Sequence, residues 1–263
     1  MDRLTVAAVA VAAFALANVV HEGVGHGGAC LLVGGRAEAL SAIHFDGDLA
    51  GLPASAGRWV ASGGTLANIA LGLLAAVALR AARSASGPVR LFLWLSMTVN
   101  LLQASGYWLF SGIGGIGDWA KVIEAGSPRW AFRLGLALTG GAAYWGVVRW
   151  SLRELVPLLG PAPGIWRRAV PLTVIPYVTG GVLYVVAGLP NPVGPQLVLV
   201  SAAAASFGGA SGLAWMAQFL RNERRFPPHP DPAVVIPRDT AWIAAGVVVA
   251  LLFVLVLGPG VRL

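Results

Sequence analysis

Long apolar runs alternate with short polar stretches along the whole chain. A membrane-spanning helix needs about 20 mostly apolar residues, and seven segments of this sequence meet that requirement. The segments are roughly Leu4–Val33, Trp59–Leu79, Val89–Phe110, Ala131–Leu152, Ala169–Leu189, Leu197–Leu220 and Thr240–Leu257. We therefore predict an all-α protein, a polytopic transmembrane helical bundle of about seven spans, forming one integral membrane domain over residues 1–263.

Composition and charge support a membrane environment. Only 11% of the residues are charged, whereas soluble domains usually devote about a quarter of their residues to Asp, Glu, Lys and Arg. The net charge of +7 does not indicate nucleic-acid binding, because the arginines are scattered between apolar runs, as is typical of anchoring at lipid headgroups. The first apolar run continues past Ala17 to Val33, so we expect a retained span and not a cleaved signal peptide.

The distribution of basic residues predicts an orientation. Twelve of the 18 Arg and Lys residues lie on the side of the expected bundle that holds the N-terminus, and six lie on the other side. Cytoplasmic loops usually carry the excess of basic residues. We therefore expect a cytoplasmic N-terminus and an external C-terminus, in a multi-pass protein of the cell (plasma) membrane.

One acidic residue, Glu22, lies well inside an apolar run, in the sequence Asn18-Val-Val-His21-Glu22-Gly-Val-Gly-His26. A carboxylate in the middle of a membrane helix costs about 2.5–3.5 kcal/mol on insertion scales, so its presence indicates function. His-Glu followed by a second His is typical of helix-borne zinc peptidases, in which two imidazoles bind Zn²⁺ and the Glu is the general base on the zinc-bound water. We predict that His21 and His26 are metal ligands and that Glu22 is catalytic.

The two histidines are five positions apart, whereas the usual His-Glu-x-x-His motif places them four apart. On a regular helix, side chains five positions apart point about 140° away from each other and cannot share an ion. A π-type turn widens a helix locally and is frequent at functional sites, and Gly23 and Gly25 make this distortion easier. The spacing therefore predicts a π-type turn at His21–His26. The arrangement His-Glu-x-x-Gly-His also resembles the zinc motif of the dipeptidyl-peptidase III family, over these six residues.

A zinc site of this type needs a third protein ligand, and Asp118 is the best candidate. The first and third expected spans cross the membrane in the same direction, so the late half of the first and the end of the third lie toward the same face. The Gly-rich stretch before Asp118 can fold back into the bundle, which is tolerated where irregular backbone is buried in protein or lines a wet cavity. Cys30, four positions after His26, is the alternative ligand, although packing is the simpler explanation for a small cysteine in such a helix.

Several short motifs, in order along the chain, extend the resemblance to a known family. They are His-Glu…Gly-His at 21–26, Gly34-Gly35-Arg36, Gly63-Gly64-Thr-Leu-Ala-Asn68, and Asn100 followed by Asp118. This order resembles the site-2 protease family of intramembrane zinc metalloproteases over residues 18–125. The chain departs from the family pattern in the extra residue of the zinc motif, in Trp119 where the family has glycine, and in the 18 positions that separate Asn100 from Asp118.

The resemblance implies a metalloprotease-like core at residues 18–125, additional spans at 130–263, and a short membrane-associated strand region in the first loop. It also implies that Asn68 and Asn100 orient the substrate or hydrogen-bond to the metal ligands, although interhelical hydrogen bonds explain both residues equally well. The metal of this family usually faces the cytoplasm. The arginine distribution instead places the three expected ligands toward the external face, so the orientation of the site stays open.

We therefore expect a zinc-dependent enzyme that hydrolyses peptide bonds of membrane-embedded substrates. Its partners would be membrane lipid and a membrane-protein or peptide substrate, and no nucleic acid. A catalytically inactive relative that binds membrane proteins is an alternative, which the irregular histidine spacing favours. A transporter with a His/Glu proton relay is a further alternative, but no other span carries an interior carboxylate or lysine to continue the relay. His44 and His229 lie in polar loops, where we expect them to be solvated.

Overall fold

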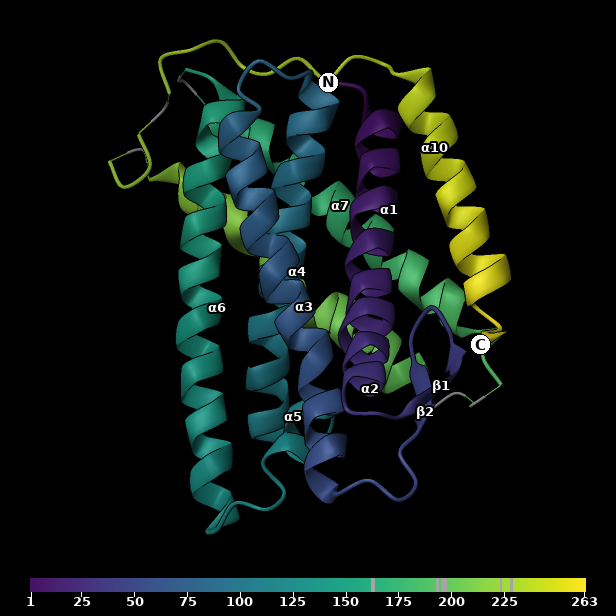
Figure 1. Cartoon of the computed structure of the whole chain (residues 1–263). Helices are drawn as coiled ribbons and strands as arrows, with labels where there is room; N and C mark the ends of the chain where they lie inside the picture. Colours follow the sequence, from purple (N-terminus) through teal and green to yellow (C-terminus); the bar gives the residue numbers. More distant parts are fainter. Residues whose placement is uncertain (162–163, 193, 195–197, 223, 228) are drawn as a thin grey trace.

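The computed structural model describes residues 1–161, 164–192, 194, 198–222, 224–227 and 229–263, with only the backbone described at 198–201, 203 and 205. Most described residues are helical, and the long helices lie alongside one another with a small sheet near one end (Figure 1). The helices are α1 (Arg3–Val19), the π-helix η1 (Val20–Gly27), α2 (Gly28–Leu32), α3 (Ala54–Ala81), α4 (Gly87–Gly114), α5 (Asp118–Val122), α6 (Arg129–Leu159), α7 (Ile165–Gly188), the π-helix η2 (Val198–Gly209), α9 (Gly212–Trp215), the 3₁₀-helix η3 (Met216–Arg221), α10 (Thr240–Leu251) and the π-helix η4 (Leu252–Leu257). The strands are β1 (Arg36–Leu40), β2 (Phe45–Asp48) and β3 (Val261–Arg262).

Aspartates cap the N-termini of two of the apolar helical segments. The Asp2 carboxylate accepts a hydrogen bond from the Thr5 amide at 2.9 Å at the start of α1. Asp239 accepts hydrogen bonds from the amides of Ala241 and Trp242, both at 3.1 Å, at the start of α10. The first amides of a helix have no partner within the helix. These carboxylates therefore fix where α1 and α10 begin.

Among the described residues, four helical segments are long and apolar enough to cross a membrane, and they indicate a membrane protein. They are Arg3–Leu32, Ala54–Ala81, Ile165–Gly188 and Thr240–Leu257. These segments correspond to the first, second, fifth and seventh expected spans. The helical class is thus confirmed, whereas the expectation of about seven spans is not supported.

The other three expected spans are not among these four segments, for separate reasons. α4 and α6 are helices of 28 and 31 residues, but neither is apolar enough to qualify. α4 carries Asn100 and Gln103, which are buried inside the bundle, and α6 carries Arg149, Arg153 and Glu154. The sixth expected span, Leu197–Leu220, lies partly outside the described residues. Polarity directed into the protein therefore lowers the hydropathy of α4.

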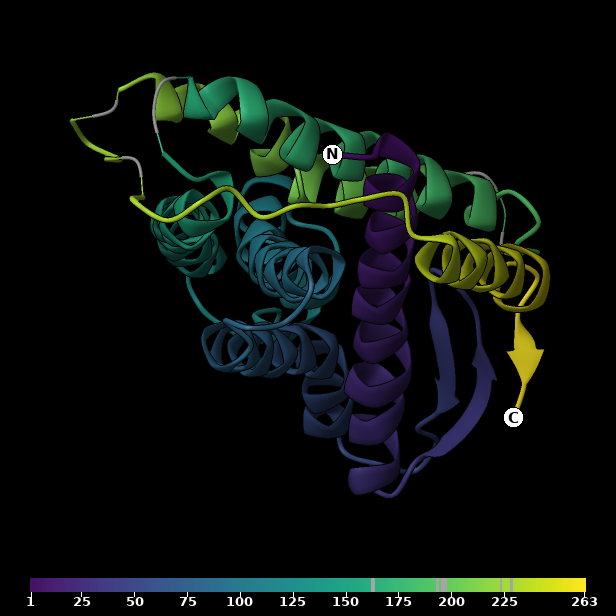
Figure 2. The ribbon, with the colours of Figure 1, turned by 90° about the horizontal axis from the view of Figure 1, so that it is seen from above.

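The other helices and the sheet lie around α1 (Figure 2). Seen from above, α1 lies between the sheet on one side and α3, α4 and α6 on the other, while α7 and η2 run along a third side (Figure 2). Small residues allow the helices to approach closely. A Cβ atom on Gly112 of α4 would lie 2.5 Å from the Ala137 nitrogen of α6, and one on Gly106 would lie 3.0 Å from the Gly209 Cα of η2. Close packing of α4 against α6 and η2 thus depends on glycine.

A three-stranded antiparallel sheet, in the order β2-β1-β3, packs beside η1. β1 and β2 lie in the first loop, which confirms the expected strand region, while its association with the membrane stays a prediction. β3 comes from the far end of the chain and pairs Val261 with Leu40 of β1. The Asn18 side chain donates a hydrogen bond to the Ala42 carbonyl between the first two strands. The protein is therefore not purely α-helical, and its sheet is fixed to the helical segment that holds the histidines.

Candidate metal centre

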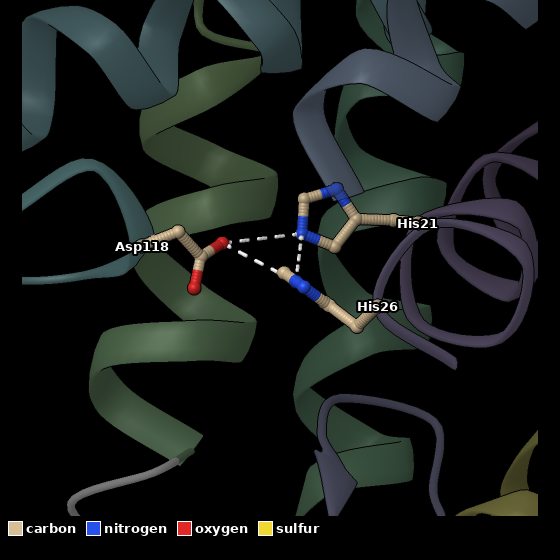
Figure 3. Close-up of side chains that lie close together, drawn as sticks. All are labelled: His21, His26 and Asp118. Carbon is tan, nitrogen blue, oxygen red and sulfur yellow. Dashed lines mark hydrogen bonds and ion pairs between the residues drawn. The ribbon is translucent and has the colours of Figure 1, made fainter. Parts of the chain in front are cut away.

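The π-type turn predicted from the histidine spacing is present as η1. In a π-helix each backbone hydrogen bond joins residues five apart, so positions i and i+5 come one above the other. His21 and His26 accordingly project to the same side (Figure 3). Their Nε2 atoms lie 3.2 Å apart, and their rings are nearly perpendicular, with an interplanar angle of 82°. The two imidazoles therefore face one common point.

Glycines make both the wide turn and the space in front of it. A Cβ atom on Gly25 would lie 2.5 Å from the Gly64 Cα, so η1 and α3 touch backbone to backbone. A Cβ atom on Gly64 would lie 2.5 Å from His21 Nε2 and 2.7 Å from His26 Nε2. Any side chain at position 64 would fill the space between the two imidazoles. Gly64 therefore keeps this space open.

Asp118 completes the group from the first residue of α5. The chain reverses after α4 through Gly115 and Gly117, whose φ angles of +68° and +82° favour glycine. Asp118 Oδ2 lies 3.5 Å from His21 Nε2 and 3.4 Å from His26 Nε2. Figure 3 shows the carboxylate approaching both rings from the opposite side. The structure thus brings the three predicted ligands together.

Trp119 fixes α5 in this place. Its indole Nε1 donates a hydrogen bond of 2.9 Å to Thr65 Oγ1 of α3. Its ring also meets Trp108 of α4 edge to face, with ring centroids 5.6 Å apart. Thr65 follows Gly64 directly, so the tryptophan links Asp118 to the helix that borders the histidines. Trp119 therefore anchors Asp118 to α3 and α4.

The three groups can hold a metal ion. Tetrahedral zinc with bonds of about 2.0–2.1 Å to its ligands places the ligand atoms about 3.3–3.4 Å from one another. The three separations here are 3.2, 3.4 and 3.5 Å. Two imidazoles and one carboxylate also form a donor set suited to zinc, with a fourth position left for water. Both the spacing and the chemistry of the donors fit this metal.

Hydrogen bonds on the far side of each imidazole orient it. His21 Nδ1 lies 3.2 Å from Asn68 Oδ1, and His26 Nδ1 lies 2.7 Å from the carbonyl oxygen of Val60. Carbonyl oxygens only accept hydrogen bonds, so each Nδ1 must carry the proton and donate it. The lone pair of each Nε2 then remains available to a metal. Asn68 thus contacts His21, while a contact with substrate stays a prediction.

A chain of buried hydrogen bonds continues from Asn68 through three more helices. Asn68 Nδ2 donates to Gln103 Oε1 of α4 at 3.3 Å, and Gln103 Nε2 donates to the Tyr184 hydroxyl of α7 at 3.4 Å. The Tyr184 hydroxyl in turn donates to the Phe14 carbonyl of α1 at 2.7 Å. All three side chains are almost completely buried. The orientation of His21 therefore depends on α3, α4, α7 and α1 together.

Asn100 does not join this chain, although the sequence suggested it. Its Nδ2 donates to the Ser96 carbonyl of its own helix at 2.7 Å. Gln103, one turn further along α4, reaches Asn68 instead. Gln103 lies three positions after Asn100 in the same apolar run, and both carry an amide side chain. The sequence alone could not decide which of the two reaches Asn68.

Glu22 lies beside the ligands but is not one of the three. It is buried in η1, and its carboxylate has no hydrogen-bond partner among the described residues. It follows His21 directly in η1, which places it beside the candidate metal centre. The ring of Tyr107, which the sequence reasoning missed, stacks on His21 with centroids 5.1 Å apart.

The other candidate ligands lie elsewhere. The Cys30 thiol points to the Arg36 carbonyl oxygen, 3.6 Å away. It is buried, so packing explains it and it is not the third ligand. His44 is exposed in the loop between β1 and β2, and His229 Nδ1 accepts a hydrogen bond from the Asp231 amide in another loop.

Comparisons of the chain with protein-family models, with curated proteins and with solved structures found no match. The geometry of the site is therefore the basis for its function.

Proposed function

We propose that this protein is an intramembrane zinc metallopeptidase of the cell membrane, which hydrolyses peptide bonds of membrane-embedded substrates. One observation carries the proposal: His21 Nε2, His26 Nε2 and Asp118 Oδ2 meet at the spacing of tetrahedral zinc ligands. The histidines belong to a segment long and apolar enough to cross a membrane. Ionisable side chains inside such a segment have an energetic cost in the membrane, so their presence there indicates a function.

When bound, Zn²⁺ supplies a Lewis acid that polarises the peptide carbonyl and makes water a stronger nucleophile at neutral pH. Glu22 accepts the proton of the attacking water as the new C–O bond forms. The carboxylic acid then gives this proton to the amide nitrogen as the C–N bond breaks. The products are a carboxylic acid and an amine, the acid's proton passes to the amine to give carboxylate and ammonium, and Glu22 returns to its ionised form.

Other residues hold the ligands for this chemistry. Asn68 and the Val60 carbonyl keep the imidazoles in one tautomer and one orientation, which lowers the cost of arranging the ligands around the ion. The Trp119–Thr65 hydrogen bond keeps Asp118 beside them. The substrate would be a membrane helix or its frayed end, because a peptide bond must leave its helix before water can attack it.

The proposal is tested by measuring metal content and hydrolysis in the purified full-length protein. We expect about one zinc per chain by elemental mass spectrometry, and cleavage of a reconstituted transmembrane test peptide. His21→Ala should lose both the zinc and the activity. Glu22→Gln should keep the zinc and lower turnover on the order of a hundredfold or more, because a general base contributes about 10²–10⁴-fold.

Cys30→Ser is the control, since the thiol lies outside the group, and it should keep both zinc and activity. Stoichiometric zinc together with unchanged turnover in Glu22→Gln would contradict the catalytic assignment. Stoichiometric zinc without hydrolysis in the unmodified protein would instead favour an inactive relative that binds membrane proteins.

A further inference from the structure

A cavity of about 530 Å³ borders the metal centre on the side of Asp118. α4 contributes Tyr107, Phe110 and Ile113 to its wall, and Asp118 itself is part of the lining. The volume is within the range of about 300–1,000 Å³ that is usual for ligand pockets. This volume is larger than that of a single amino-acid side chain. The cavity therefore offers room for several connected groups directly beside a metal ligand.

The opposite wall comes from helices outside the protease-like core. It includes Tyr144 of α6 together with Ala204 and Gly208 of η2, the helix in faded yellow-green beside Asp118 in Figure 3. The Tyr144 hydroxyl accepts a hydrogen bond from the Gly212 amide at 2.7 Å and lies 2.9 Å from the Gly209 carbonyl oxygen. These bonds hold α6 to the end of η2, so this wall is formed before any ligand binds.

The lining is mainly apolar, but it presents one polar group that has no partner. The Tyr107 hydroxyl makes no hydrogen bond with any described residue, and Tyr107 lines the cavity beside Asp118 while its ring stacks on His21. A hydroxyl in such surroundings gains most from a ligand that carries a hydrogen-bonding group, such as a peptide carbonyl. A lipid acyl chain would fill the volume but would leave the hydroxyl without a partner.

We propose that this cavity binds an unwound apolar segment of the peptide substrate next to the bond that is cleaved. α6 and η2 then determine which residues the substrate has at these positions, while η1 and α5 carry the chemistry. The inference rests on the proposed function and deepens it, because it names the substrate class and the helices that recognise it. Apolar side chains are favoured, since a charged one would enter a mainly apolar wall without a compensating partner.

The test uses a variant that fills the cavity and a matched control. Gly208 lines the cavity, and a Cβ atom there would have no heavy atom within 4 Å, so the side chain of Gly208→Leu starts in open space at the cavity wall and adds volume there. A Cβ atom on Gly146 of α6 also has no neighbour within 4 Å, and Gly146 does not line the cavity. Gly146→Leu is therefore the same substitution at an exposed helical position away from the site.

Binding is measured separately from hydrolysis. The full-length Glu22→Gln protein is reconstituted with a transmembrane test peptide of about 20 apolar residues that carries a diazirine-labelled leucine at its centre. After irradiation, mass spectrometry locates the crosslinks. We expect them at Phe110, Ile113 and Ala204. Adding Gly208→Leu should reduce their yield about tenfold or more, because the added side chain takes up the pocket, and adding Gly146→Leu should leave it unchanged.

Crosslinks elsewhere, or an equal yield with Gly208→Leu, would overturn the inference. So would a diazirine-labelled phospholipid that reacts at these residues while the peptide does not. Zinc content and cleavage are measured on the same proteins without Glu22→Gln. A failure of the proposed function appears as absent zinc or absent cleavage in the unmodified protein, whereas a failure of the inference leaves both intact and alters only the crosslinks.

Discussion

Two π-helical segments of this chain show what a widened turn does and does not provide. η1 and η4 both follow a regular apolar helix, and both lie in segments long and apolar enough to cross a membrane. η1 contains His21, Glu22 and His26, and it packs closely against α3. η4 has the sequence Leu-Phe-Val-Leu-Val-Leu, and Phe253 is its one buried residue.

The difference between them lies in what they face. η1 faces the open space at Gly64 and an aspartate held by Trp119. Phe253 of η4 instead packs its ring at 5.8 Å from the ring of Tyr184. The wide turn places side chains five positions apart on one side in both segments, but in η1 these side chains are imidazoles that meet a carboxylate, whereas in η4 they are leucines. A π-helical turn is therefore a means of aligning ligands, and the partners on other helices make it a site.

The largest effect is expected from closing the space in front of η1. Gly64→Ala places a methyl group 2.5–2.7 Å from both Nε2 atoms, in the volume that an ion between them needs. Zinc content, measured by elemental mass spectrometry, should fall from about one per chain to background. Gly28→Ala is the control, because a Cβ atom there has no neighbour within 4 Å. Retained zinc in Gly64→Ala would show that the ion does not lie between the two imidazoles.

A smaller effect is expected from removing the group that orients His21. Asn68→Ala deletes the acceptor of the Nδ1–H hydrogen bond while the ligand itself remains. Loss of such an outer partner usually weakens metal affinity by about 10–100-fold. Competition with a chelator of known zinc affinity measures the change. An affinity equal to that of the unmodified protein would mean that packing alone fixes the His21 ring.

The next prediction separates Gln103 from Asn100. Gln103→Leu breaks the chain between Asn68 and Tyr184, and zinc affinity should fall by about tenfold or less, since this residue acts one step further from the metal. Tyr184→Phe should give a change in the same direction, while its ring contacts with Phe14 and Phe253 are kept. Asn100→Ala should leave zinc affinity unchanged. A larger loss in Asn100→Ala than in Gln103→Leu would contradict this order.

The smallest effect is expected in η4. Leu255 is 66% exposed, and Leu255→Ala should change neither zinc content nor affinity. The free energy of unfolding should change by less than about 0.5 kcal/mol, as is usual for surface positions. Thermal unfolding in detergent and the same chelator competition measure both quantities. A loss of zinc in this variant would show that η4 contributes to the metal centre after all.

Much of η1 was predictable because it is local. His21 and His26 can share an ion only if their helix widens, and that follows from helix geometry and their spacing. The apolar run around them identified a membrane segment. Counting apolar runs worked less well for α4, where Asn100 and Gln103 point into the protein and reduce its apolar character. The pairing of β3 with β1 was not predictable, since it joins two segments more than 200 positions apart.

By itself, the sequence determined the helical class with its apolar membrane segments, the position of the wide turn and the two imidazoles that face each other across it. These depend on residues within one helix, whose relative directions the backbone hydrogen bonds fix. Only the tertiary structure decided that Asp118 and not Cys30 completes the group, that Gln103 and not Asn100 reaches Asn68, and that Gly64 borders the space between the two imidazoles. Such contacts depend on how closely separate helices approach one another. Glycine pairs and single hydrogen bonds such as Trp119–Thr65 set that approach, and spacing along the chain does not record it.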